Sequence, residues 1–400
     1  MTTIENTAAR TMSPSLRRIL GWLHLWIGLI FCIPFAILGV TGSILVYDEP
    51  LADFVSSPPH ASAQGEMKSV QEIVDAAAAA RGGATPLFLT MPTEAGDAAI
   101  IRFSTGEGRG RNSIVQTYVD PVSLQVLDTR SFARNYWIGL AHDLHGNMMW
   151  NGRQGRQLVG WFGVGMLLLG ISGLIMWWPR NTWRGSFGVK KGARGWLFHR
   201  QLHATCGVAS WVLFIILSFS GVAISFPQTT GAFLRTTFGL TESPLPGQAA
   251  KVEPVPGATP INTDQAVAIA LKAVPGARLA SVFFPAREDQ PLRVNLLGAG
   301  MSAGVPAITV NIDQYKGETI SVRDPWNGDV ADSVLAWQRP LHFGRGTSEL
   351  YKLAIFIVGL LPPLFAFTGV AMWWTKRRTR AMAKVSRQQQ TATVAGVPAE

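Results

Sequence analysis

Four long apolar runs constrain the fold of this 400-residue chain more than any other feature. They cover residues 19–47, 157–179, 201–227 and 353–375. Each exceeds the roughly 20 residues that a helix needs to cross a bilayer. The first is far longer than the roughly 7–15-residue apolar core of a signal peptide, and no small-residue cleavage site follows closely, so an uncleaved anchor is expected. Only 15% of the residues are charged, against about 25% in soluble domains, which also favours a membrane protein with sizeable water-exposed parts.

The basic residues lie beside these runs on one predicted side of the membrane. Segments 1–18, 180–200 and 376–400 hold 15 of the 35 Lys and Arg residues but 2 of the 25 acidic residues. By the positive-inside rule these segments are cytoplasmic, and the long segments 48–150 and 228–345 face outward. The net charge of +10 therefore reports topology, and nucleic-acid binding loses its main support.

The chain repeats its own pattern in two halves. In the first and third spans a Leu-His pair is followed four residues later by Gly, and eighteen residues after the His by a second Gly. Before the second and fourth spans Leu-His occurs again, followed within the span by a hydroxyl residue, Gly and Met-Trp-Trp. A unit used twice in one orientation predicts a pseudo-twofold axis along the membrane normal. The matching residues are His24 and His203, Gly28 and Gly207, Gly42 and Gly221, His145 and His342, and Ser172 and Thr368.

The two outward segments also match each other, and each is predicted to form a small α+β domain. A capped helix is expected at 69–81 in the first and at 263–273 in the second. Alternating apolar and polar residues then predict four strands in each segment. These are 86–91, 98–104, 113–119 and 124–128, and 278–285, 291–297, 306–312 and 318–323.

Four of the seven histidines are related by the repeat, two near each end of the predicted bundle. The axis brings His24 to face His203 at the cytoplasmic end, and His145 to face His342 at the outward end. Two imidazoles from opposed helices in an apolar bundle are typical of a bis-histidine haem site. Zinc or di-iron sites would need Cys or carboxylate ligands, but the spans hold no acidic residue and the two cysteines are not related by the repeat.

Small residues accompany these histidines. Gly28 and Gly207 share a helix face with their histidines, and a missing side chain there leaves room for a flat macrocycle. Gly42 and Gly221 lie on the same stripe, about 27 Å along the helix. Close helix packing explains such glycines equally well.

Other polar residues rank second. His142 and His199 lie one helical turn before a paired histidine, so either is an alternative ligand, a propionate contact or a proton relay. Arg153, Arg156 and Arg345 follow the outward histidines, where they suit haem propionates or lipid headgroups.

Several motifs resemble those of the PepSY-associated transmembrane family over about residues 15–380. They are RRILGWLHLWIGLIFCIPFAILGVTGSILVYDEPL, HRQLHATCGV, GISGLIMWW, PLHFG and FTGVAMWW. The resemblance implies four spans and two periplasmic PepSY domains in the bacterial inner membrane. It also implies similarity to ferric-siderophore reductases with two b-type haems, whose iron would be held here by His24, His203, His145 and His342.

Three function classes follow. The leading hypothesis is a transmembrane haem-dependent reductase of a periplasmic ferric siderophore. The chain has no Gly-rich nucleotide motif, so its electrons are expected from a separate cytoplasmic donor or a quinol. A PepSY-domain sensor or protease regulator without redox activity is the alternative. A transporter is disfavoured because no charged residue is expected at the membrane midplane and no broken helix at depth.

Overall fold

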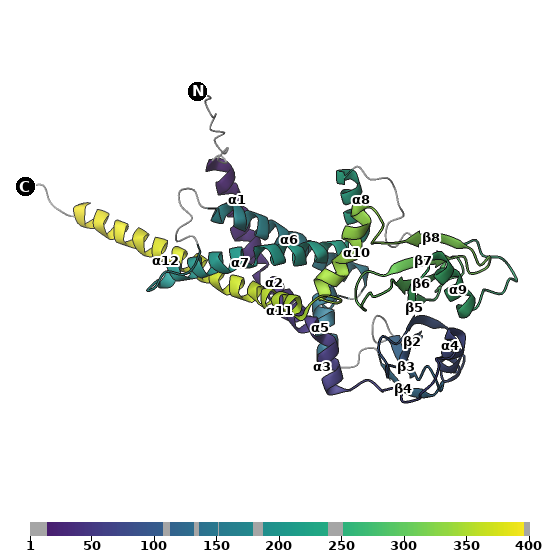
Figure 1. Ribbon diagram of the computed structural model, residues 1–400. Helices are drawn as coiled ribbons and strands as arrows, with labels where there is room; N and C mark the ends of the chain where they lie inside the picture. The colour runs from purple at the N-terminus through teal and green to yellow at the C-terminus, as the bar shows by residue number, and fades with distance from the viewer. Residues whose placement is uncertain are drawn as a thin grey trace, which may run out of the picture. The chain divides into compact units, whose positions relative to one another are not determined.

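The computed structural model describes residues 14–106, 113–131, 136–150, 152–178, 187–238 and 251–395 (Figure 1). The chain divides into two compact units, described in turn below. The first is made of residues 1–43, 162–219 and 356–400, and the second of 44–161 and 220–355. Parts of the predicted cytoplasmic segments and of the second outward segment, at 1–13, 179–186, 239–250 and 396–400, lie outside the described residues.

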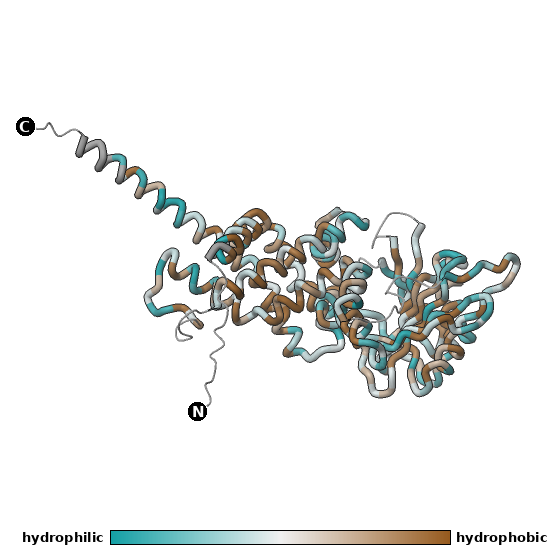
Figure 2. The backbone as a smooth tube through the Cα atoms, turned by 90° about the horizontal axis from the view of Figure 1, so that it is seen from above, coloured by the Kyte–Doolittle hydropathy of each residue, from teal (hydrophilic) through white to brown (hydrophobic). Residues whose placement is uncertain are grey.

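The apolar runs form long helices, which Figure 2 colours mainly brown for hydrophobic. Within the part of the chain that the structure describes, three helices are long and apolar enough to cross a membrane, and a bent pair that counts as one span raises this to four. The prediction of several membrane-crossing helices is thus confirmed at the level of length and composition. The helices are α1 (Pro14–Ile30), α2 (Cys32–Val46), α6 (Arg153–Trp177), α7 (Gly195–Ser225), α11 (Glu349–Gly359) and α12 (Leu361–Ala395).

The first span is not one straight helix, which corrects the expectation of no broken helix. Helices α1 and α2 meet at Phe31 at an angle of 68°. Pro34, in the first turn of α2, has no N–H to donate to the carbonyl of Ile30, and its ring crowds that carbonyl. The helical ladder resumes at once, where the Phe35 N–H donates to the Phe31 carbonyl. The argument against a transporter therefore keeps only the lack of charged residues within the spans.

Close backbone contact joins α2 to the helices of the fourth span. A Cβ on Gly39 would lie 2.4 Å from the carbonyl oxygen of Gly359, so no larger residue fits there without a shift. The Ser43 hydroxyl donates to the Phe356 carbonyl at 2.8 Å. Small residues that let helices approach and polar groups that bond across them are the usual means of packing in lipid.

The second unit contains one antiparallel sheet of eight strands in the order β4-β3-β2-β1-β5-β6-β7-β8. All eight strands lie within a few residues of the predicted positions. The strands are β1 (Pro86–Thr90), β2 (Ala99–Ser104), β3 (Ile114–Val119), β4 (Val126–Ser131), β5 (Arg278–Phe283), β6 (Leu292–Leu297), β7 (Ile308–Ile312) and β8 (Thr319–Arg323).

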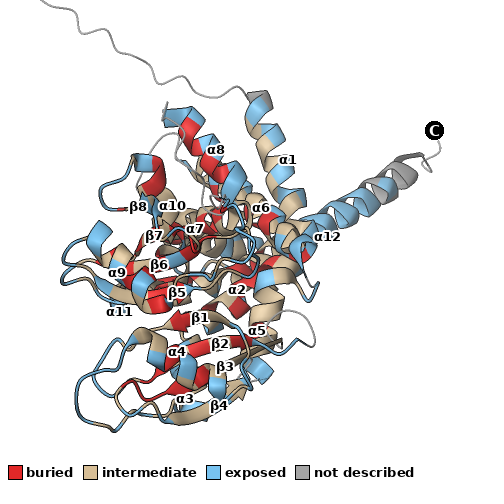
Figure 3. Cartoon of the chain, turned by 90° about the vertical axis from the view of Figure 1, so that its right-hand side faces the viewer, coloured by how far each residue is buried: buried red, intermediate tan, exposed pale blue. Residues whose placement is uncertain are grey.

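The two predicted α+β domains share this sheet, which differs from the expectation of separate domains. Strand β1 pairs with β5 through Phe88↔Phe283, Leu89↔Val282 and Thr90↔Ser281. Helices α4 (Val70–Ala79) and α9 (Thr263–Ala273) pack on one face. Both are capped, as predicted, each by a capping box with Ser69 or Asn262 as the N-cap residue. One core of buried residues lies beneath them, and Figure 3 colours buried residues red. In a separate half, the edge strand β1 or β5 would leave a row of backbone N–H and C=O groups unpaired. Pairing β1 with β5 satisfies these groups, so the continuous sheet is favoured.

Shorter helices complete the second unit: α3 (Asp48–Val55), α5 (Tyr136–Asn147), α8 (Pro227–Phe238) and α10 (Val330–Phe343). A buried ion pair at 3.1 Å joins Arg235 of α8 to Asp332 of α10. Asp332 also accepts from Arg323 of β8, so one carboxylate holds α8, α10 and the sheet edge together.

Candidate functional site

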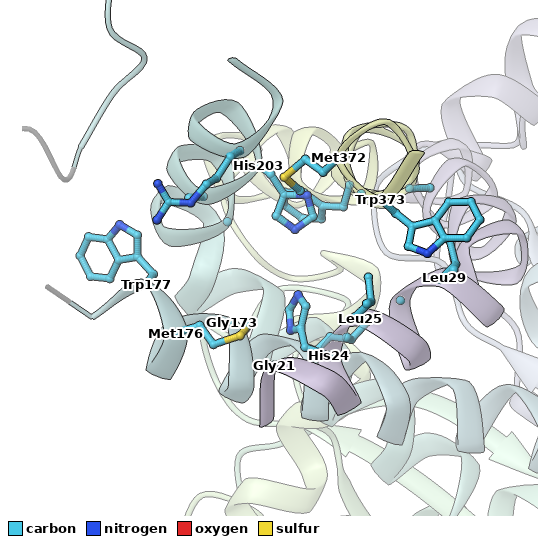
Figure 4. A pocket seen from close by; sticks show the side chains of 18 of the residues that line it. Gly21, His24, Leu25, Leu29, Gly173, Met176, Trp177, His203, Met372 and Trp373 are labelled. Carbon is cyan, nitrogen blue, oxygen red and sulfur yellow. The ribbon is translucent and has the colours of Figure 1, made fainter. Parts of the chain in front are cut away.

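His24 of α1 and His203 of α7 face each other in the first unit, as the repeat predicted. Their ring centres are 6.3 Å apart, with an angle of 69° between the planes. Figure 4 shows both imidazoles directed into one cavity, toward each other. Because a metal–imidazole bond measures about 2.0 Å, two rings that share one metal ion have centres roughly 6 Å apart. The separation therefore suits a single metal ion between the rings.

A helix hydroxyl fixes the tautomer of each ring. Thr368 of α12 donates its hydroxyl proton to the Leu364 carbonyl at 2.7 Å, so its oxygen can only accept from His203 Nδ1, 2.8 Å away. Ser172 of α6 is held in the same way and lies 2.9 Å from His24 Nδ1. With Nδ1 protonated, each neutral imidazole presents the lone pair of Nε2 as a ligand.

The residue after each hydroxyl is glycine, and at one of the two positions its role is visible. A Cβ on Gly173 would lie 3.3 Å from Cε1 of His24, so the bare backbone leaves the imidazole its place. The hydroxyl–Gly pattern is visible in the sequence as part of the repeat. That it positions a histidine is evident only from the contacts of Ser172 and Gly173 with His24.

A cavity of about 1290 Å³ surrounds the two imidazoles. It exceeds the roughly 300–1,000 Å³ of typical small-molecule sites. Gly28 and Gly207 line it: a Cβ on Gly207 would meet nothing within 4 Å, and one on Gly28 only Leu169 at 3.9 Å. Helix packing therefore does not explain these two glycines, unlike Gly39. The predicted room for a flat group is present at both positions.

Aromatic side chains and cations line the same cavity. Phe35 and Phe214, each eleven residues after a histidine, contribute apolar walls. Among the described residues, the cavity lining includes no Asp or Glu but five basic residues: Arg17, Arg200, Lys376, Arg377 and Arg380. In the sequence, these basic residues indicated only the topology of the chain. A cavity with apolar walls and a cationic part suits a ligand that is largely apolar but carries carboxylates.

His145 of α5 and His342 of α10 also face each other, within the second unit. Their ring centres are 5.9 Å apart at an interplanar angle of 47°. Ser220 Oγ lies 2.8 Å from His342 Nδ1, and a Cβ on Gly221 would lie 3.3 Å from His342 Cε1. The hydroxyl–Gly arrangement that holds His24 is thus present at His342 as well.

The two second-rank histidines have other surroundings. His142 Nε2 lies 3.1 Å from a carboxylate oxygen of Asp48, which also pairs with Arg345. Burial raises the pKa of Asp48, but His142 and Arg345 outweigh it and hold that pKa below its usual value. His199 packs its ring against Phe198 and Phe367. The structure brings neither into the facing pairs.

Of the predicted outward arginines, Arg153 and Arg156 are exposed near the start of α6, and Arg345 is bound to Asp48 and Glu49. The sequence missed Arg339, which lies three residues before His342. Partial burial and the like charges of Arg156 and Arg345 lower the pKa of Arg339. A cluster of mutually repelling cations beside a histidine pair is a place where an anionic group gains binding energy.

The two pairs together are suited to hold haem. Each offers two facing imidazoles, and at least the first has preset Nε2 lone pairs, apolar walls, space beside glycine, and cations for carboxylates. Both cysteines, Cys32 and Cys206, are free in the structure.

The comparison with curated proteins gave no match. A family model described as the PepSY-associated TM region matches residues 21–376, which is most of the chain and includes both histidine pairs. With its apolar helices, this match makes the protein a multi-pass membrane protein. The chain belongs to the PepSY-associated transmembrane family.

Proposed function

We propose that this protein is a dihaem oxidoreductase that passes electrons across the bacterial inner membrane and reduces a periplasmic ferric siderophore for iron uptake. The observation that carries the proposal is the His24–His203 pair, with both Nδ1 atoms tied to helix hydroxyls and a large cavity around the rings. A sensor or protease regulator would have no use for this arrangement.

When bound, a b-type haem supplies one-electron redox chemistry, and the protein's part is to bind, orient and tune it. His24 and His203 would hold one iron, and His145 and His342 the other. Ser172 and Thr368 keep the ligand tautomer and ring orientation, since second-shell partners fix metal-binding histidines. Gly28 and Gly207 leave space for the ring, and the basic residues of the cavity neutralise carboxylates.

The proposed topology rests on charge and on the internal repeat. The cytoplasmic side would carry both termini and the loop at 180–200, and the sheet would be periplasmic. The repeat relates the His24–Ser172 contact to the His203–Thr368 contact, and this correspondence supports a tandem repeat about a pseudo-twofold axis. The electron donor would be a separate cytoplasmic protein, a small reductant or a quinol.

The proposed substrate follows from iron chemistry. A siderophore binds Fe(III) through hard oxygen ligands, and one added electron gives Fe(II), which such ligands hold more weakly. Reduction outside the cytoplasmic membrane would therefore release the iron.

The test is spectroscopic. Protein purified from haem-replete cells should be red, with a Soret band and a sharp α-band on reduction by dithionite. Anaerobically reduced protein should be reoxidised by ferric chelates at a rate that depends on the chelate. A colourless preparation would refute the proposal and favour the sensor or regulator, while coloured protein that no ferric chelate reoxidises would refute the substrate.

A further inference from the structure

One row of side chains crosses all eight strands of the sheet. The strand register pairs Phe88 of β1 with Arg102 of β2 on one side and with Phe283 of β5 on the other. Phe283 pairs in turn with Arg293 of β6. The row continues to Gln116 and Arg130 in the first half and to Asn311 and Ser321 in the second. Directly opposed residues share one face of a sheet, so all these side chains lie on the same face.

The centre of the row is symmetric. The rings of Phe88 and Phe283 are 4.2 Å apart between centres. The guanidinium of Arg102 lies 5.0 Å from the Phe88 ring centre, and that of Arg293 lies 4.7 Å from the Phe283 ring centre. Two aromatic rings flanked by two cations therefore stand where the halves of the sheet meet.

The row lies on the face away from the core. Leu89 and Val282, the neighbours of the two phenylalanines, are fully buried beneath α4 and α9. On the row's face, Arg130 donates to the Ser56 and Ser57 carbonyls just after α3. Arg323 of β8, two residues after Ser321, reaches Asp332 of α10. The row therefore faces the side of α5 and α10, the helices that carry His145 and His342 (Figure 1).

The charge of this face favours an anion. Asp128 and Asp332 neutralise Arg130 and Arg323 at the two flanks. The row itself has no acidic residue, and Arg293 is exposed, with no ion pair or hydrogen bond to any residue that the structure describes. The Arg293 guanidinium, which lies over the Phe283 ring, keeps its N–H edge open for oxygen anions.

We propose that Arg102, Phe88, Phe283 and Arg293 form a docking site for an anionic ferric chelate of the aryl-oxygenate class. The arginines would bind its phenolate or carboxylate oxygens, and the phenylalanine rings would pack against its aromatic rings. That the chelate is the substrate rests on the proposed function. The site itself needs no electron transfer.

The experiment uses the full-length protein in detergent and a redox-inert probe, gallium(III) tris-catecholate, a trianion with three aromatic rings. Binding is measured by equilibrium dialysis with gallium quantified by mass spectrometry. Arg102→Gln and Arg293→Gln should each weaken binding about tenfold, since a charge-assisted hydrogen bond is lost. Arg287→Gln is the matched control, because Arg287 is exposed in the β5–β6 turn and paired with Asp289. Gallium(III)–desferrioxamine B, a cation without aromatic rings, should bind weakly and equally to all variants.

The melting temperature of each variant is compared with that of the wild type to exclude misfolding. If Arg102→Gln does not fold, the binding measured for Arg293→Gln decides the test. Three results would overturn the proposed site. They are wild-type affinity of Arg293→Gln for gallium tris-catecholate, an equal loss of affinity in Arg287→Gln, and tighter binding of the cationic probe than of the anionic one. Arginine-dependent binding in protein that never holds haem would refute the proposed function and leave the docking site standing. Haem-loaded Arg293→Gln that reduces ferric tris-catecholate with wild-type kcat/KM would refute the docking site alone.

Discussion

Replacement of Thr368 by Val tests whether the helix hydroxyls prepare the histidines for a metal. Thr368 is fully buried and valine matches its shape, so the change removes the hydroxyl and little else. The 2.8 Å contact to His203 Nδ1 is lost, and the neutral ring is then free to carry its proton on Nε2, the atom needed for iron. Loss of such a second-shell partner lowers metal affinity about 10–100-fold, or about 1.4–2.7 kcal/mol.

The assay is haem transfer to excess apomyoglobin, followed at the Soret band. The loss of affinity is expected in the dissociation rate, so Thr368→Val should release one of its two haems about 10–100-fold faster than wild type. The control is Thr375→Val, in which the lost hydroxyl also donates to a carbonyl of its own helix, that of Ala371, but makes no hydrogen bond to a histidine among the described residues. Equal release rates for the two variants would refute the reasoning.

Three further predictions concern other contacts described above. Asp332→Asn should destabilise the protein by about 3 kcal/mol, measured by denaturant or thermal unfolding, because Arg235 would lose its buried partner; an unchanged transition would contradict this. Gly173→Ala should lower haem affinity severalfold in the transfer assay, since its Cβ would crowd His24 at 3.3 Å; unchanged release would show that the ring has room. Asp48 has a lowered folded-state pKa, so its stabilising effect is present above the pKa of about 3.9 of an unfolded Asp and is lost as the pH falls through the folded value. Wild-type melting temperature should therefore fall more steeply than that of Asp48→Asn below about pH 4, and parallel pH profiles would contradict the lowered pKa.

Local patterns predicted the elements of the sheet and of the helices that pack on it well. Period-two alternation located all eight strands, and the capping residues located α4 and α9. The internal repeat predicted that His24 faces His203 and that His145 faces His342, and both pairs are present in the structure. These features depend on neighbours in sequence or on matching motifs, so they are readable from the chain alone.

Other features depend on contacts between distant residues. The pairing of β1 with β5 joins two segments that each looked like a complete domain. The bend at Phe31 had a visible signal in Pro34, which the apolar length of the span obscured. The partners Ser172 and Thr368 are 148 and 165 residues from their histidines, too far for spacing to reveal.

The central claim is that the two histidine pairs each hold one haem, and haem stoichiometry tests it most directly. The pyridine haemochrome assay on purified protein, with protein quantified by amino-acid analysis, should give two b-type haems per chain. His24→Ala and His203→Ala should each lower the value to one, and the double variant should also retain one. A wild-type value near zero would contradict the account. A double variant that holds no haem, while each single variant holds one, would show that His24 and His203 do not share an iron.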